Sequence, residues 1–408
     1  MCLDMTALTK ISQWFTSLGR VFRNELRLIV SDMGVLLFFV ALPLAYPVVY
    51  TLIYNPEVVR KLPVAVIDDS RTVASRDLVR KMSASPAIEV YAYCNDLPEA
   101  RALHANGDVF GIVAIPSDYA RKLGTGEAAH VSFFADVSLL LRYRALLSAL
   151  TELQIDMISE ITGEKIAAVG LSSLAGGMST PVKSESNFLG DTEQGFASFV
   201  IPGIVILILQ QSMLLGICLL GGTSRERRRV NGGYDPRQTN AGTLATVWGK
   251  ALAYTVFYIP LTIYITRFIP EMFNLPHYGR AVDYLLFIFP MLLATAFLGQ
   301  ALNYFMKERE SAFIIIVFTS VIFLFLSGLT WPRYAMNQLW TWTGNCVPAI
   351  WGVEGFIRIN SNAATLSEVS TPFLALWVLT AVYMLLACWV TKYINLNASR
   401  FSVKNGGS

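Results

Sequence analysis

An uncharged stretch runs from Met33 to Pro56, MGVLLFFVALPLAYPVVYTLIYNP, and it decides how the rest of the chain is interpreted. An α-helix needs roughly 20 apolar residues to cross a bilayer, so this stretch predicts a transmembrane span. The next uncharged stretches come only after the water-compatible residues 57–194. They cover residues 195–224, 251–266, 284–306, 311–332 and 369–391. The chain is therefore predicted to be an α-helical polytopic membrane protein with six spans and a large domain inserted after the first.

The overall composition agrees with this prediction. Hydrophobic residues make up 54% of the chain, charged residues make up 15%, and the mean hydropathy is +0.49, which lies outside the usual balance of soluble domains. A net charge of +3 is too small to indicate nucleic acid as a partner.

Basic residues in the short connections predict the orientation. Fifteen of them lie before span one, between spans two and three, between spans four and five, and after span six; four lie in the alternate connections. Because basic short loops stay cytoplasmic, both termini are expected inside and residues 57–194 outside. The fifteen are Lys10, Arg20, Arg23, Arg27, Arg225, Arg227, Arg228, Arg229, Arg237, Lys250, Lys307, Arg309, Lys392, Arg400 and Lys404, and the four are Arg267, Arg280, Arg333 and Arg358.

Five segments follow from this pattern. We expect a cytoplasmic amphipathic helix at 1–32, a first span at 33–56 acting as an uncleaved signal anchor, an extracytoplasmic α/β domain at 57–194, five further spans at 195–391 and a cytoplasmic tail at 392–408. The amphipathic helix is expected in the inner membrane interface, either as an orientation anchor alone or also touching a cytoplasmic partner. Its apolar stripe is Leu8, Ile11, Phe15, Leu18, Phe22, Leu26 and Ile29, and Asp32 is the expected N-cap of the following helix.

Strand and helix signals alternate in the inserted domain, which predicts an α/β fold. Strands are expected at 62–67, 87–94, 109–115 and 129–135, with helices at 71–82, 97–105 and 117–123 and a long helix at about 138–165. Asp68, Asp69 and Asp136 follow strands, where they either hold a ligand or cap helices. The domain has no GxSxG elbow, Cys–His pair or metal-ligand cluster, so we expect a binding or docking module without catalytic or metal-binding residues.

The order of motifs in the membrane half carries a family resemblance. The segments are FVIPGIVILILQQS (199–212), SRERRR (224–229), VWGKALAY (247–254), FLSGLTWP (325–332) and NCVPAIWGVEGFIRI (345–359). Together they resemble the ABC-2 type permease family, specifically the exporters with a large outside domain between spans one and two. The resemblance covers essentially the whole chain. It departs in the inner loop, where three arginines follow Glu226 instead of the family's Arg-Glu-x-Glu-x-Gly-Thr.

The resemblance implies that a separate ATPase drives the chain. The segment from Gly242 to Lys250 is not a phosphate-cradling loop, because six residues separate its glycines and Ala251 occupies the Ser/Thr position. ATP and Mg are therefore expected on partner ABC ATPase subunits, and no cofactor on this chain. The expected ATPase-coupling residues are Arg225, Glu226, Arg227, Arg228, Arg229 and Glu308; the alternative is that the arginines only enforce topology.

Two further groups of residues are expected to act in the membrane. Residues 333–358 are aromatic yet interrupted by Asn, Gly and Pro, which predicts a re-entrant segment of two short helices dipping in from outside. Glu354 is then either a functional carboxylate or a structural partner of Arg358. The re-entrant or gate candidates are Gly328, Pro332, Pro348, Glu354 and Arg358, and the dimer-interface or pathway candidates are Pro202, Gly203, Gln210 and Gln211, with Ser212 beside them.

The function predicted from these observations is that of the permease subunit of an ABC exporter. It would move an amphiphilic or hydrophobic compound, such as a drug or lipid, out across a bacterial inner membrane. Partners would be ABC ATPase subunits, an identical or different second permease half, membrane lipid and a periplasmic adaptor on the outside domain. A non-transporting membrane receptor or scaffold is the main alternative, and a polytopic membrane enzyme is the third.

Overall fold

The computed structural model describes residues 2–54, 59–168, 195–239 and 241–405. Six helical segments in these ranges are long and apolar enough to cross a membrane, and a four-stranded α/β region separates the first from the others, which confirms the predicted fold class. The segments are Met33–Tyr54, Phe196–Val230, Thr243–Met272, Ala281–Leu302, Arg309–Leu326 and Ser370–Asn395.

The chain divides into two compact units. Met1–Glu57 and Phe188–Ser408 form the first, here called the membrane unit, and Val58–Asn187 form the second, here called the α/β unit. The α/β unit lies within the predicted inserted domain, whose bounds of 57–194 stay a prediction.

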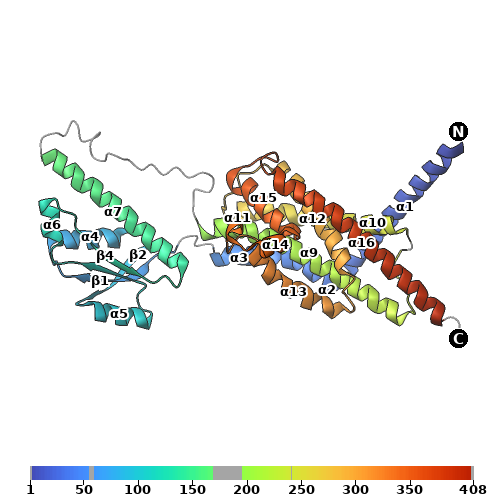
Figure 1. Cartoon of the computed structure of the whole chain (residues 1–408), viewed down its shortest axis with the longest axis horizontal. Helices are drawn as coiled ribbons and strands as arrows, with labels where there is room; N and C mark the ends of the chain where they lie inside the picture. The colour runs from blue at the N-terminus through green and yellow to red at the C-terminus, as the bar shows by residue number, and fades with distance from the viewer. Residues whose placement is uncertain (1, 55–58, 169–194, 240, 406–408) are drawn as a thin grey trace. The chain divides into compact units, whose positions relative to one another are not determined.

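The α/β unit is built around a sheet of order β2-β1-β3-β4, in which β3 and β4 are antiparallel and the other pairs are parallel. Helix α5 covers one face, whereas α4, α6 and α7 cover the other (Figure 1). All eight predicted elements are present, with ends moved by a few residues. They are β1 Leu62–Asp68, α4 Val73–Ala84, β2 Ile88–Cys94, α5 Leu97–Asn106, β3 Gly111–Ile115, α6 Tyr119–Thr125, β4 Ser132–Ala135 and α7 Leu140–Ala168.

The membrane unit is helical throughout. Two π-helical turns, η1 and η2, lie just before Pro43 and Pro270, where missing proline N–H groups favour local departures from α-helix. Its elements are α1 Cys2–Ser31, α2 Met33–Leu36, η1 Leu37–Ala41, α3 Leu42–Tyr54, α9 Phe196–Val230, α10 Thr243–Ile263, η2 Tyr264–Phe268, α11 Ile269–Met272, α12 Ala281–Leu302, α13 Arg309–Leu326, η3 Arg333–Ala335, α14 Gln338–Asn345, α15 Pro348–Asn362 and α16 Ser370–Asn405.

Helix α9 is the centre of the membrane unit. It packs against α3, α12, α13 and α15, and most of its apolar length is buried inside the chain. Gly222 lets α13 approach closely, because a Cβ atom there would lie 2.7 Å from the backbone oxygen of Glu308. The outer helices α13 and α16 expose apolar side chains instead, as helices facing lipid do. These include Ile314, Val317, Phe318, Val321, Phe325, Leu374, Val378, Leu385 and Trp389.

Helix α1 packs along α10. Val21, Glu25 and Ile29 are buried there, whereas Ile11 and Phe15 are exposed. Of the predicted apolar stripe, Ile29 is therefore buried against the chain, whereas Ile11 and Phe15 are exposed. Exposed apolar side chains on this part of α1 suit a helix that lies in a membrane interface. A glutamate at the centre of the buried stretch was not predicted.

Candidate functional site

The predicted coupling residues Arg225–Arg229 lie in the last turns of α9, and Glu308 is the N-cap of α13. Glu226 Oε1 accepts a hydrogen bond of 2.7 Å from the backbone N–H of Arg309, the first residue of α13. Arg229 Nη1 lies 3.1 Å from Glu308 Oε1 in an exposed ion pair. The structure therefore joins the end of α9 to the start of α13, and Glu226 satisfies a backbone donor that would otherwise lack a helical partner.

Asp32, the residue before α2, joins the start of the first span to the same contacts between α9 and α13. Its carboxylate accepts hydrogen bonds from the backbone N–H groups of Gly34 and Val35, which confirms the predicted N-cap. It also accepts two bonds from the guanidinium of Arg309, at 2.9 and 2.7 Å. Burial alone would raise the pKa of Asp32, but the bonds from Arg309 and Val35 lower that pKa below its ordinary value. We name the end of the membrane unit that carries Asp32, Arg225–Arg229, Lys250 and Arg309 the basic end.

Arg227 folds the loop after α9 back onto the helix. Its guanidinium donates to both carboxylate oxygens of Asp235, at 2.9 and 3.1 Å, and Ser224 donates to the same carboxylate at 2.5 Å. The Asp235 side chain is only 2% exposed. Arg227 is thus paired within the chain, which sequence reasoning did not anticipate.

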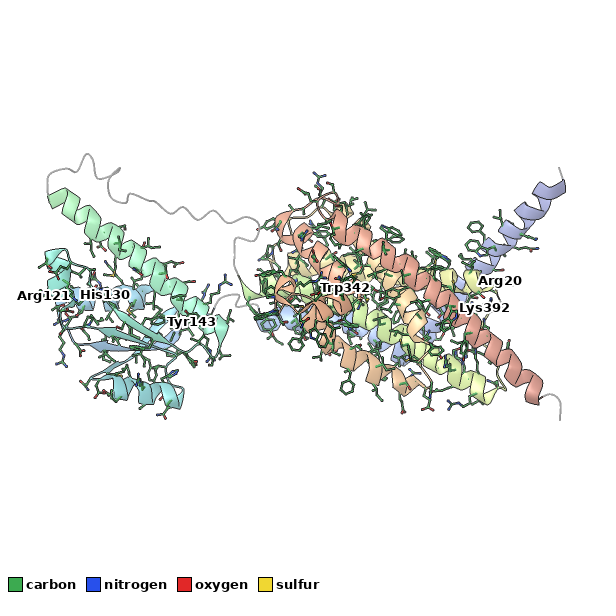
Figure 2. All side chains as sticks on the ribbon, in the orientation of Figure 1. Arg20, Arg121, His130, Tyr143, Trp342 and Lys392 are labelled. Atoms are coloured by element: carbon green, nitrogen blue, oxygen red, sulfur yellow. The ribbon has the colours of Figure 1, made fainter. Side chains whose placement is uncertain are left out.

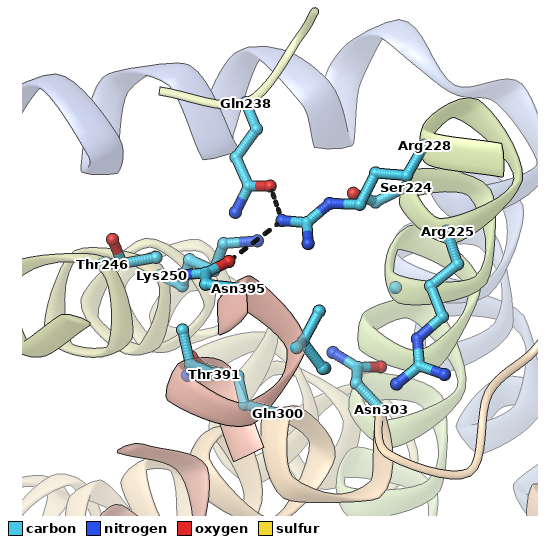
Figure 3. Close-up of a pocket in the computed structure, with 12 residues that line it drawn as sticks. Ser224, Arg225, Arg228, Gln238, Thr246, Lys250, Gln300, Asn303, Thr391 and Asn395 are labelled. Carbon is cyan, nitrogen blue, oxygen red and sulfur yellow. Dashed lines mark hydrogen bonds between the residues drawn. The ribbon is translucent and has the colours of Figure 1, made fainter. Parts of the chain in front are cut away.

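Arg225 and Arg228 are arranged differently. Arg228 reaches across to the side-chain oxygens of Gln238 and Asn395, while Arg225 extends along α9 beside Asn303 (Figure 3). Both arginines line a polar hollow at the basic end together with Lys250.

A buried carboxylate that the sequence analysis missed also lies at the basic end. Glu25 of α1 is 2% exposed; it accepts a hydrogen bond from the hydroxyl of Tyr254, and Lys250 Nζ lies 3.4 Å from its Oε1. Both partners come from α10. The spacing of Glu25, four residues from both Val21 and Ile29, was the signal available in the sequence.

The predicted re-entrant segment contains two short helices, α14 and α15, as expected. Glu354 pairs with Arg358 at 3.1 Å, so the predicted structural pair is present. A second and closer pair was not predicted: Arg333 Nη1 lies 2.5 Å from Glu354 Oε2. Arg333 also donates to Asn345 and lies over the Trp351 ring, and it thereby ties η3 to both helices.

The other gate candidates shape the backbone around these helices. Gly328 has φ +91°, a left-handed conformation that favours glycine, and it ends the turn after α13. Pro332 is the N-cap of η3, and Pro348 opens α15, where its missing N–H costs nothing.

The pathway or dimer candidates lie on α9. Pro202, Gly203 and Gln210 are buried inside the chain, and a Cβ atom on Gly203 would lie 2.4 Å from Leu329. Gln210 Oε1 accepts a 2.6 Å bond from the backbone N–H of Ala349, near the start of α15. Gln211, the fourth candidate, is half-buried, and both predicted roles, dimer interface and pathway, stay predictions for these residues.

Gln210→Leu is expected to destabilise the membrane unit by roughly 1–3 kcal/mol, because it leaves the buried N–H of Ala349 without an acceptor. Gln211→Leu is the matched control: both side-chain polar atoms of Gln211 are buried without a partner among the described residues, so its replacement should be neutral or stabilising. Thermal unfolding in detergent measures both, and equal midpoints would contradict the role of Gln210.

In the α/β unit two of the three predicted strand-end carboxylates, Asp68 and Asp136, form turns. Asp68 accepts bonds from the backbone of Ser70 and Arg71 and from the Ser75 hydroxyl, and Asp136 accepts one from Ser138. These contacts are local turns, and the N-cap of the following helix α4 is Thr72. His130 precedes β4 (Figure 2), and no three His, Cys, Asp or Glu side chains of the described ranges gather as a metal site would require.

Comparison with known proteins identifies the membrane architecture. A family model described as ABC-2 family transporter protein matches residues 33–389. No curated protein matches the chain by sequence. The match begins at the first candidate span and ends within the last one, so it includes the α/β unit and all the coupling and gate candidates. The chain belongs to the ABC-2 family of transporter membrane proteins.

Proposed function

We propose that this chain is the permease subunit of an ATP-driven exporter that moves an amphiphilic or hydrophobic compound out across a bacterial inner membrane. Membrane subunits of this family generally pair with ABC ATPase subunits and are typically not catalytic themselves. Under this proposal both termini are cytoplasmic, the α/β unit is extracytoplasmic, where it meets an adaptor, and a second permease half completes the pump.

One observation carries the proposal: charged contacts link the ends of three elements at the basic end. Asp32 holds Arg309, Glu226 holds the backbone of Arg309, and Arg229 holds Glu308. A force applied there by an ATPase would reach the start of the first span, the end of α9 and the start of α13 together. Such a linkage suits coupling better than topology alone, which would require basic residues but no such partners.

Purification of the full chain from its native host in mild detergent tests the assembly. The exporter is supported if an ATPase with a phosphate-binding loop co-purifies in a stoichiometric amount. It is also supported if inside-out vesicles that contain the complex accumulate a fluorescent amphiphile in an ATP-dependent way. A homo-oligomer that repeatedly lacks an ATPase would favour the receptor or scaffold instead.

Glu226→Ala is expected to abolish most of the substrate-stimulated ATPase activity of the assembled complex, while membrane insertion and basal ATPase activity persist. The physical reason is that the variant frees the first N–H of α13 and uncouples α13 from α9. Glu271→Ala is the control, because it removes an ion pair with Arg267 that lies outside the contacts of the basic end and is 47% and 51% exposed, and therefore weak. An unchanged stimulated rate in Glu226→Ala would eliminate this coupling role.

A further inference from the structure

A polar hollow of about 60 Å³ lies at the basic end, among α9, α10, α12, α16 and the loop after α9 (Figure 3). Three of its lining side chains are cationic and none is acidic. The lining residues are Gly221, Ser224, Arg225, Arg228, Gln238, Thr246, Lys250, Gln300, Asn303, Thr391, Ile394 and Asn395.

The charges around this hollow do not balance. Lys250 is compensated by Glu25, and the neighbouring Arg227 by Asp235. Arg228 binds only the neutral oxygens of Gln238 and Asn395, and its Nη1 atom is buried without a partner among the described residues. Arg225 has no ion pair with any acidic residue in the ranges that the structure describes. Arg225 and Arg228 therefore bring two positive charges to the hollow without an ion-pair partner among the described residues, and the acid that acts on Arg228 is Asp235, which is itself paired with Arg227.

Uncompensated guanidinium groups in a half-buried site are costly, because desolvation is not repaid by an opposite charge. A guanidinium presents a planar fork of donors that matches the oxygens of a phosphate, and side-chain amides add further donors. A volume of about 60 Å³ admits a single tetrahedral oxyanion, given that a water molecule occupies roughly 30 Å³ of the liquid.

We propose that Arg225 and Arg228 bind a phosphate group in this hollow. The group belongs either to a phospholipid whose headgroup reaches the basic end or to free inorganic phosphate. The proposal is independent of transport, because it concerns a charge site that the chain possesses before any ATPase binds.

The test uses the full chain, purified in mild detergent in buffers free of phosphate and sulfate. Mass spectrometry of the intact protein measures retained phospholipid, and the thermal unfolding midpoint is measured with added inorganic phosphate against chloride at equal ionic strength. Arg225→Gln with Arg228→Gln is the test variant. Arg229→Gln is the matched control, because Arg229 lies on the same helix but is exposed and paired with Glu308.

If the parent and Arg229→Gln each retain about one phospholipid per chain and the double variant loses it, the bound phosphate group belongs to a lipid. If inorganic phosphate raises the unfolding midpoint of the parent, and the double variant binds phosphate at least roughly tenfold more weakly, the site takes free phosphate. Equal lipid retention and equal phosphate response in the parent and the double variant would overturn the proposal.

Asn395→Asp keeps the test decisive if the double variant fails to fold. The new carboxylate would lie where the Asn395 oxygen now accepts from Arg228 at 3.3 Å, and would supply one missing counter-charge. This variant is expected to fold, to unfold at a higher midpoint without phosphate, and to lose most of its lipid or phosphate binding. Undiminished binding would overturn the proposal.

Discussion

Glu25→Ala is expected to destabilise the membrane unit by about 3–5 kcal/mol, the largest effect of a single substitution predicted for this chain. Glu25 is almost fully buried, and its carboxylate is the partner of Lys250, which is itself only 23% exposed. Removal of the acid leaves a largely buried ammonium group without a counter-charge and the Tyr254 hydroxyl without its acceptor. It also removes the polar contacts between α1 and α10 at this point, although the apolar packing of Val21 against Gly249 remains.

The measurement is the thermal unfolding midpoint of the purified chain in detergent. Glu271→Ala is the control, since Glu271 forms an exposed pair with Arg267 and its loss should be nearly neutral. The double variant Glu25→Met with Lys250→Met removes both charges and should recover most of the lost stability, because apolar residues can replace a buried pair. A midpoint for Glu25→Ala that equals that of Glu271→Ala would show that the pair contributes nothing.

The sequence predicted the parts of this fold that depend on periodicity. Runs of apolar residues long enough to cross a bilayer identify the six spans without any knowledge of their neighbours. Strands of the α/β unit are likewise bounded by Gly, Pro and Asp residues, such as Asp68 and Gly107, whose local conformational preferences mark the ends of elements.

Charge partners were not predictable in the same way. Glu25, Asp32 and Asp235 each pair with a cation on another element. Arg333 pairs with Glu354, which follows 21 residues later, beyond helix α14. A sequence gives the spacing of a charge along its own helix but not which face of a neighbour it meets. The pair of Glu354 with Arg358 lay within reach of sequence reasoning, because the two residues are four apart on one helix, as are Arg267 and Glu271.

The same limit explains the arginines of α9. Their clustering predicted one shared surface for an ATPase, whereas three distinct environments are present in the structure. Arg227 is paired with a buried carboxylate, Arg229 with an exposed one, and Arg228 with two amides at a hollow. An ATPase contact for this cluster stays a prediction, and the side chain that it would engage most readily is the exposed Arg229.

Asp235→Asn is expected to destabilise the basic end by about 2–4 kcal/mol at neutral pH, because the substitution leaves Arg227 without its counter-charge. This loss should be smaller than that of Glu25→Ala, because asparagine keeps one side-chain oxygen that can accept from Arg227, whereas alanine keeps no acceptor. The loop after α9 should also detach, since Asp235 accepts from Ser224 and from the backbone N–H of Arg237 as well. The readout is the unfolding midpoint, with Glu308→Ala as the exposed control.

The effect of Asp235→Asn should depend on pH in one direction. Burial alone would raise the pKa of Asp235, but the hydrogen bonds from Arg227 and Ser224 lower that pKa below the ordinary value of 3.8. A carboxylate whose pKa is lower in the folded state stabilises the protein above its ordinary pKa, and the stabilisation is lost as the pH falls through the folded value. The difference in midpoint between the parent and Asp235→Asn should therefore stay constant from about pH 7 to pH 5 and shrink below about pH 4. A difference that persists unchanged under acid would mean that the amide disturbs packing rather than charge, and the ion pair would then not be what holds the loop.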